Sequence, residues 1–233
     1  MLIFTDIETT GLEADDVMCG IALLSEDKVM YELLNEGKKI PPLASSIHHI
    51  TNEMIQDKKL FIQSEVHDFL EQNNNPKNTL IAHNIKFDLE KLAAAGLHWQ
   101  GDIIDTLKVT KHLIKECELF SLEFLRYELK LYMQENEIKQ KYGIKDALCT
   151  DKALSDVLVT KLLFEYLLEY ATVKEMKELS FQNVLLEKFT FGKYKGKYIE
   201  EIVLNDRSYI AWMLSLKELD EDLKYSLEYY MRG

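Results

Sequence analysis

Two acidic residues near the start of the chain, Asp6 and Glu8, have the spacing of side chains on one face of a β-strand. They lie in an apolar run, residues 2–8, which predicts a strand and places the two side chains roughly 7 Å apart along its backbone. Carboxylates on an otherwise apolar face are costly to bury unless they are paired or bind a metal ion. The pair therefore indicates metal or acid–base chemistry, and a half-exposed edge strand is the alternative without a function.

Two aspartates further along the chain extend this pattern. Asp88 follows an apolar segment, residues 79–82, that predicts a short buried strand, and ligands commonly bind just beyond strand ends in open sheets. Asp156 lies on a predicted helix, at the edge of the face that its apolar residues turn to the core. A solvated helix acid is the alternative interpretation of Asp156.

The elements that must position these acids follow from the periodicity of the apolar residues. Residues 2–8, 17–24 and 28–34 predict an antiparallel meander, which Pro41-Pro42 brings to an end. A helix over 62–72, a strand over 79–82 and a helix over 86–95, ended by Gly96, follow. Residues 103–106 predict a strand end, and a helix continues from there through 115. Two further helices are predicted, one through 129 with Ser121 as its N-cap, and a long one to 170 with Thr150 or Asp151 as its N-cap. This order is typical of a mixed α/β sheet flanked by helices.

The composition is that of a soluble globular protein, with 47% hydrophobic and 29% charged residues among 233. No stretch approaches the ~18 consecutive apolar residues of a membrane helix, and the N-terminus lacks the pattern of a signal peptide. Three widely spaced cysteines argue for a reducing compartment and against a disulfide framework. We therefore expect a cytoplasmic protein without a membrane partner.

Several segments occur together in a recognisable order, and they include all four acids: Asp6-Ile7-Glu8-Thr9-Thr10-Gly11-Leu12, Ile47-His48-His49-Ile50-Thr51, His83-Asn84-Ile85-Lys86-Phe87-Asp88, Ile104-Asp105-Thr106-Leu107, Ser121-Leu122-Glu123-Phe124-Leu125 and Ala153-Leu154-Ser155-Asp156. The set resembles the motifs of the DEDD exonuclease superfamily, to which the proofreading subunit of DNA polymerase III belongs. The likeness covers about residues 1–170.

The resemblance implies a ribonuclease-H-like fold and a two-metal hydrolysis of phosphodiesters. It implies that Asp6, Glu8, Asp88 and Asp156 hold two Mg²⁺ or Mn²⁺ ions, which are hard cations that prefer oxygen ligands. Such a pair of ions can stabilise both the attacking and the leaving oxygen of an in-line displacement. The residues then expected beside the terminal nucleotide or in the pocket wall are Thr9, Thr10, Gly11, Leu12, His48, His83, Asn84 and Phe87. For each histidine, a structural hydrogen-bonding role is an equal alternative.

One position departs from the family's pattern. The main branch of the family has a general-base histidine five residues before the last aspartate, where this chain has Asp151. The other branch has a tyrosine four residues before it, where this chain has Lys152. An aspartate, with an ordinary pKa of about 3.9, is a weaker base at neutral pH than a histidine. We expect Asp151 to act as a substitute base or an outer-shell metal contact in a slowed enzyme, with a helix N-cap as the alternative.

The last part of the chain changes in character. We expect an exonuclease domain over residues 1–172, a connecting helix over 173–187 and a small module over 188–233 that is similar to the C-terminal module of the bacterial exonuclease X family. Its segment 188–198 interleaves lysines with aromatic residues, as single-strand binders do. Candidate nucleic-acid contacts there are Lys193, Tyr194, Lys195 and Lys197. A β-hairpin with water-exposed lysines is the alternative, and a protein partner is a further possibility.

The net charge of −12 counts against a large basic footprint on nucleic acid, but not against a small cleft that holds a strand end through metal ions. The resulting hypothesis is a 3′→5′ DNA exonuclease that releases nucleoside 5′-monophosphates from 3′ ends, preferably single-stranded. An exoribonuclease and a non-catalytic nucleic-acid-binding relative are the alternatives.

Overall fold

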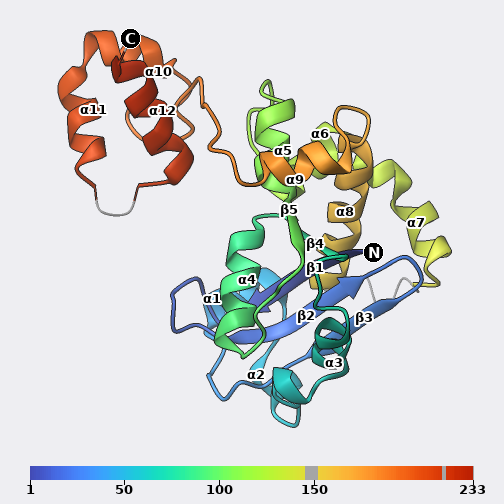
Figure 1. The fold of residues 1–233 in the computed structure, drawn as a ribbon. Coiled ribbons are helices and arrows are strands. Elements are labelled where there is room, and N and C mark those ends of the chain that lie inside the picture. Colours follow the sequence, from blue (N-terminus) through green and yellow to red (C-terminus); the bar gives the residue numbers. More distant parts are fainter. Residues whose placement is uncertain (145–151, 217–218, 233) are drawn as a thin grey trace.

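The computed structural model describes residues 1–144, 152–216 and 219–232. Its centre is a five-stranded sheet of order β3-β2-β1-β4-β5 (Figure 1). The strands are β1 (Leu2–Thr9), β2 (Met18–Leu24), β3 (Val29–Leu33), β4 (Thr79–Ala82) and β5 (Asp102–Asp105). The predicted antiparallel meander β1–β2–β3 is confirmed, and β4 and β5 run parallel to β1. The mixed α/β prediction is therefore correct.

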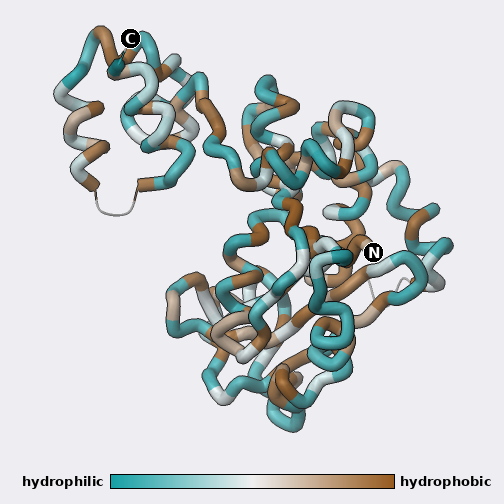
Figure 2. Tube along the Cα trace, in the orientation of Figure 1, coloured by the Kyte–Doolittle hydropathy of each residue, from teal (hydrophilic) through white to brown (hydrophobic). Residues whose placement is uncertain are grey.

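Both faces of the sheet are covered, which explains why its strands are apolar on both sides. On one face, Phe4 and Ala22 pack with helix α8 (Lys152–Leu167) in one core cluster. On the other face, Ile3 and Ile7 join a second cluster with helix α3 (Glu65–Gln72) and helix α4 (Ile85–Ala94). Hydrophobic residues concentrate along these strands, whereas the surrounding loops are mainly hydrophilic (Figure 2).

Further helical elements connect and flank this framework. They are α1 (Pro42–His48), α2 (Asn52–Ile55), η1 (Phe61–Gln63), α5 (Thr106–Leu113), α6 (Leu122–Glu128), η2 (Leu131–Gln134), α7 (Glu135–Lys141), α9 (Val173–Leu179), α10 (Ile199–Asn205), α11 (Arg207–Leu214) and α12 (Glu221–Arg232). The helix predicted from residue 62 starts later, because Ser64 caps it at its first turn and a 3₁₀ turn precedes that cap. Pro42 opens helix α1, since proline suits the first helical position.

The connecting helix predicted for residues 173–187 is too long. Thr172 and Glu175 form a capping box at its start, but α9 ends at Leu179. Beyond that point, side chains bind the backbone: the Asp105 amide donates to Ser180 Oγ, and the Val184 amide donates to Asp222 Oδ1. These contacts from distant parts of the chain hold residues 180–187 in a non-helical connection.

Helices α10, α11 and α12 form a C-terminal module with a hydrophobic cluster of its own, built around Phe189, Ile202, Ile210 and Leu227. In Figure 1 it lies beyond α9, away from the sheet. Ion pairs link it to the helices beside the sheet, with 3.0 Å between Lys86 and Glu221. Across the described ranges, no helix is long and apolar enough to cross a membrane.

Candidate active site

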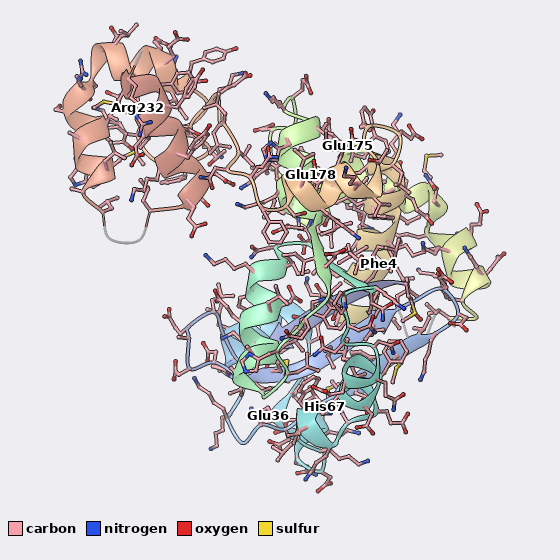
Figure 3. The ribbon with its side chains drawn as sticks, viewed as in Figure 1. Phe4, Glu36, His67, Glu175, Glu178 and Arg232 are labelled. Atoms are coloured by element: carbon pink, nitrogen blue, oxygen red, sulfur yellow. The ribbon has the colours of Figure 1, made fainter. Side chains whose placement is uncertain are left out.

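Three of the four predicted metal ligands meet above the α8 face of the sheet. Phe4, Asp6 and Glu8 alternate onto this face, and the ring of Phe4 packs edge-on against that of Phe164 of α8, with 5.4 Å between the ring centroids. Figure 3 labels Phe4 beside α8. The eight residues from Phe164 back to Asp156 span about 12 Å of helix, close to the about 13 Å from Phe4 to Glu8. Asp156 therefore reaches the level of the strand acids, and carboxylate oxygens of Asp6, Glu8 and Asp156 lie within 4.8 Å of one another.

Asp88 lies next to this trio, in the first turn of α4. It is buried, and its charge contributes to raising the pKa of Asp6. Asn84, the N-cap residue of α4, has the left-handed conformation (φ 74°), and its amide donates to Asp105 Oδ1 at 3.1 Å. Asp105 also caps α5 by accepting from the Leu107 amide at 2.9 Å. The buried carboxylate of Asp105 thus fixes the turn that presents Asp88.

Burial and mutual repulsion raise the pKa of every one of these carboxyl groups. Burial is the largest cause for Asp6, followed by the charges of Asp156, Asp88 and Glu8. Burial also raises the pKa of Glu8 to about 7, and the pKa values of Asp88 and Asp156 rise for the same main reason. Each group therefore holds its proton to a higher pH than an ordinary carboxyl does, until a cation compensates the negative charge.

The residues fit a pair of hard divalent cations. Glu8 is 9% exposed, and its Oε1 is buried without a hydrogen-bond partner. An unpartnered carboxylate oxygen is costly in the interior unless a cation takes up its charge. All four groups offer carboxylate oxygens, which Mg²⁺ and Mn²⁺ prefer. The acid cluster is thus suited to metal binding, with Asp6, Glu8, Asp88 and Asp156 as the candidate ligands.

Lys152 is an unpredicted member of this site. Its ammonium group lies 2.5 Å from Asp156 Oδ2, one helical turn away, and 3.2 Å from Glu123 Oε1 of α6. The sequence already contained one signal for it, the i,i+4 spacing of a lysine and an aspartate on one helix. The contact with Glu123 could not be inferred locally, because that residue comes from another helix.

The last residue of β1 and the turn that follows it contain the predicted nucleotide contacts Thr9, Thr10, Gly11 and Leu12. Thr9 and Thr10 are buried, and the Thr10 hydroxyl donates to Asp16 Oδ1 at 2.9 Å. Any side chain at Gly11 would meet this same carboxylate, since a Cβ would lie 2.3 Å from Asp16 Oδ2. Leu12 is 85% exposed. The turn therefore presents one large apolar side chain to solvent, four residues after Glu8.

A buried lysine of α4 holds this turn in place through hydrogen bonds to its backbone. Lys91 is 5% exposed, and its ammonium donates to the carbonyls of Glu13 at 2.6 Å and Asp16 at 2.8 Å. We expect Lys91→Met to lower the free energy of unfolding by about 1.5–3 kcal/mol, because charged hydrogen bonds are lost and carbonyls are left unsatisfied. Urea denaturation measures this change, and steady-state kinetics should show a rise in KM that exceeds the fall in kcat.

Lys38 provides the control, because it binds the same turn from the exposed side, through ion pairs with Asp15 and Asp16. Exposed pairs contribute about 0–1 kcal/mol, so Lys38→Met should change both measurements little. Equal effects of the two substitutions would contradict the anchoring role of Lys91.

His48 lies behind the strand rather than on an open surface. It is 4% exposed, its Nδ1 accepts from the Ile50 amide at 3.0 Å, and its Nε2 lies 3.2 Å from the Thr9 carbonyl. With Nδ1 as an acceptor, Nε2 carries the proton and donates to Thr9. This geometry favours the structural role that the sequence left open: His48 holds the exit of β1.

His83 is likewise bound on both ring nitrogens, with Nδ1 3.0 Å from Thr106 Oγ1 and Nε2 2.8 Å from the Phe120 carbonyl. Burial lowers its pKa, which keeps the ring neutral at physiological pH. Asn84 is exposed, whereas Phe87 is half-buried with the Lys91 ammonium 5.4 Å from its ring centroid. Of the three predicted contacts in this motif, His83, Asn84 and Phe87, only Asn84 is exposed.

The four candidate contacts of the C-terminal module differ in their surroundings. Tyr194 packs among the aromatic rings of the module, and its hydroxyl donates to Asp206 at 2.6 Å. Lys193 pairs with the same carboxylate at 3.0 Å, whereas Lys195 and Lys197 are exposed. The predicted alternative, a β-hairpin over residues 188–198, is formed only in part. In the described chain this segment contains one isolated antiparallel bridge, between residues 188 and 198.

Asp151, the predicted substitute base, lies outside the described residues. Its role therefore continues to rest on its place in the sequence, five residues before Asp156.

Several known proteins resemble this chain, and the likeness to one of them extends over its whole length. It is 25% identical to Exodeoxyribonuclease 10 of Escherichia coli (strain K12), with 100% of both chains covered. It is 31% identical to the DNA polymerase III PolC-type of Thermotoga petrophila over 121 residues, which cover 47% of this chain and 9% of that one. The solved structure titled "Exonuclease X in complex with 5′ overhanging duplex DNA" has the same fold, with a TM-score of 0.59 and 24% identity over 77% of this chain and 99% of that one.

Two family models match separate parts of the chain. The model described as "Exodeoxyribonuclease X-like C-terminal" matches residues 189–215. The model described as "Exonuclease" matches residues 3–154, which include Asp6, Glu8 and Asp88. The chain therefore belongs to the DEDD (RNase T) exonuclease family of hydrolases and carries an exodeoxyribonuclease X-like C-terminal region.

Proposed function

We propose that the chain is a 3′→5′ DNA exonuclease that hydrolyses the terminal phosphodiester with two divalent metal ions, Mg²⁺ or Mn²⁺, and releases nucleoside 5′-monophosphates. The observation that carries this proposal is the convergence of Asp6, Glu8 and Asp156 within 4.8 Å, with buried Asp88 beside them. DNA as the substrate is supported by the relative named Exodeoxyribonuclease 10, which matches the full length of the chain. The printed sequence contains no evident feature for reading a 2′-hydroxyl, so an exoribonuclease is the second candidate.

The carboxylates of Asp6, Glu8, Asp88 and Asp156 would hold the ions. When bound, two such ions supply Lewis-acid stabilisation of the attacking and leaving oxygens of phosphoryl displacement. The chain's own residues would do the positioning: Lys91 holds the turn that contains Gly11 and the exposed Leu12, which follow Glu8 by three and four residues. A terminal nucleotide held there would place its phosphodiester against the carboxylates.

Hydrolysis also needs a proton acceptor. Water attacks phosphorus, the bond to the 3′-oxygen breaks, and the water proton must leave as the new bond forms. The two histidines nearest the site in the motifs, His48 and His83, use both ring nitrogens in protein contacts. We assign proton acceptance to Asp151, as the sequence position suggests, with a lower rate than a histidine would give.

The C-terminal module, residues 188–233, is proposed to contact the single-stranded part of the substrate. Lys195 and Lys197 are exposed, and so are the rings of Phe191 (49%) and Tyr198 (51%). Exposed rings with nearby lysines are suited to stack on bases and to bind phosphates. Tyr194 is excluded from stacking by its packing and its hydrogen bond to Asp206, so its role in this proposal is structural.

Metal binding should depend on pH in a defined direction. In the metal-free protein the carboxyl pKa values are raised, that of Glu8 to about 7, so metal must displace protons near neutral pH. We expect the Mn²⁺ affinity to rise between pH 6 and pH 8, by up to about tenfold per pH unit for each proton released. Isothermal titration in two buffers of different ionisation enthalpy counts these protons, and a pH-independent affinity without proton release would contradict the raised pKa values.

The test of the function is degradation of a 5′-labelled single-stranded DNA oligonucleotide by the full chain with Mg²⁺ or Mn²⁺, beside a matched RNA. A ladder that shortens from the 3′ end on DNA, and is absent for Asp6→Ala, supports the proposal. A ladder on RNA alone establishes the second candidate. Absence of any ladder, with Mn²⁺ bound, points to a non-catalytic nucleic-acid-binding protein.

A further inference from the structure

The acid cluster contains its own cation. Lys152 lies in the first turn of α8, partly buried, with its side chain 26% exposed. Its ammonium donates to Asp156 Oδ2 at 2.5 Å and pairs with Glu123 at 3.2 Å. One of these partners is a candidate metal ligand, and the other belongs to a different helix. Lys152 therefore connects the acid cluster to α6.

Other positive charges near the cluster are committed elsewhere. Arg126 of α6 makes two hydrogen bonds to Glu135, one of them 2.7 Å long. Lys91 binds two backbone carbonyls on the far side of the turn after β1. Among the residues that the structure describes near the cluster, Lys152 is thus the cation that contacts a candidate ligand directly.

This position matters for a divalent ion. Asp156 Oδ2 already accepts a charged hydrogen bond, and an ammonium so close would repel a doubly charged ion on the same carboxylate. Glu123 offers the ammonium a second partner within the same reach, with its side chain 62% exposed. The Lys152 ammonium therefore has one partner within the acid cluster, Asp156, and one more exposed partner at the rim of the cluster, Glu123.

We propose that Lys152 is a built-in counter-ion of the metal site, which stabilises the metal-free acids and which metal ions must drive from Asp156 toward Glu123. The inference rests on the two-metal function proposed above. It makes Lys152 a positioning residue that sets the metal concentration at which the site assembles. The cost of driving the ammonium away lowers metal affinity, while its presence stabilises the metal-free protein.

A helix pair without a role at the metal site is the alternative, and α8 provides an example. Lys161 and Glu165 form another i,i+4 pair at 2.7 Å on the same helix. The Lys161 side chain is 13% exposed and lies over the ring of Phe4, and no contact to a candidate ligand is among its described ion pairs. If Lys152 were only such a pair, removing either lysine should leave the Mn²⁺ affinity unchanged.

The experiment compares wild type, Lys152→Met and Lys161→Met in the full chain, by isothermal titration with MnCl₂ and by thermal melting in EDTA. We expect Lys152→Met to bind Mn²⁺ about 10–100-fold more tightly, the range for changes to groups that surround metal ligands. In EDTA its melting temperature should fall by at least about 2–4 °C. Lys161→Met should keep the wild-type Mn²⁺ affinity.

Glu123→Gln is the second variant and moves the affinity the other way. Without its rim partner the ammonium stays on Asp156, so Mn²⁺ should bind more weakly than to wild type.

Unchanged or weaker binding by Lys152→Met, while wild type binds Mn²⁺, overturns the counter-ion role and leaves the two-metal function intact. Absence of Mn²⁺ binding by wild type and by Lys152→Met overturns both. If Lys152→Met fails to fold, the affinity of Glu123→Gln decides: weaker binding supports the role and wild-type binding overturns it.

Discussion

Asp6→Asn should abolish exonuclease activity and at the same time raise the melting temperature of the metal-free protein. Asp6 has the largest set of acidic neighbours in the site, since Asp156, Asp88 and Glu8 all raise its pKa in addition to burial. A neutral amide of nearly the same shape removes one repelling charge from this buried group. Stability and activity therefore oppose each other at this position, as is common where a site is built for a ligand.

The expected size of the two effects differs. Loss of a single preorganised electrostatic group costs about 10²–10³-fold in kcat, and we expect at least this loss for a group that binds the ions themselves. The melting temperature in EDTA should rise by about 2–4 °C for each kcal/mol of relieved repulsion. Thermal melting with and without Mn²⁺ gives a second readout, because the stabilisation by Mn²⁺ should shrink in the variant.

Asp57→Asn is the matched control, since Asp57 is exposed and remote from the cluster in sequence. It should leave activity, melting temperature and Mn²⁺ stabilisation unchanged. A metal-free Asp6→Asn protein that melts below wild type would show that Asp6 is already compensated without metal, contrary to the repulsion derived from its neighbours.

The core of the site could be predicted from the sequence because it depends on local periodicity. The two-residue spacing of Asp6 and Glu8 places both on one face of β1, and the structure shows both beside Asp156. Asp156 was placed at the edge of the core face of its helix, and its side chain is partly buried there, 17% exposed. Alternation and helical period are properties of neighbouring residues, so they survive without knowledge of the tertiary structure.

The supporting contacts could not be predicted, because they join residues far apart in the chain. The Lys91 ammonium binds the carbonyl of Glu13, 78 positions earlier, and such an acceptor has no side-chain signature. The early end of α9 has a similar cause, since the Asp105 amide and Asp222 bind the residues that follow it. Periodicity over 173–186 favours a helix, and tertiary hydrogen bonds override this preference.

In the C-terminal module the sequence pattern was ambiguous for a physical reason. Aromatic residues next to lysines occur both in stacking surfaces and in small cores, and here one segment does both. Phe189 is 1% exposed in the core of the module, whereas Phe191 is 49% exposed two positions later. These two roles differ only in the residues that each ring packs against, and the local sequence does not reveal those partners.

Asp151→His should raise kcat, by up to about 10²–10⁴-fold if proton acceptance limits the wild-type reaction. A histidine with an ordinary pKa of about 6.5 accepts a proton effectively near neutral pH, whereas a carboxylate of pKa about 3.9 is a weak base there. The pH–rate profile of the variant should therefore acquire a limb that rises through about pH 6.5, as the imidazole loses its proton. Single-turnover rates on the labelled oligonucleotide measure both the gain and the profile.

Asp151→Asn separates this chemistry from helix capping. Asparagine caps helices about as well as aspartate, so a pure N-cap would leave stability and turnover unchanged in this variant. A base or an outer-shell metal contact needs the carboxylate, and for either role turnover should fall while stability holds. Unchanged turnover in both Asp151→His and Asp151→Asn would mean that this position does not limit the reaction. The proton would then leave by a route that does not involve this side chain.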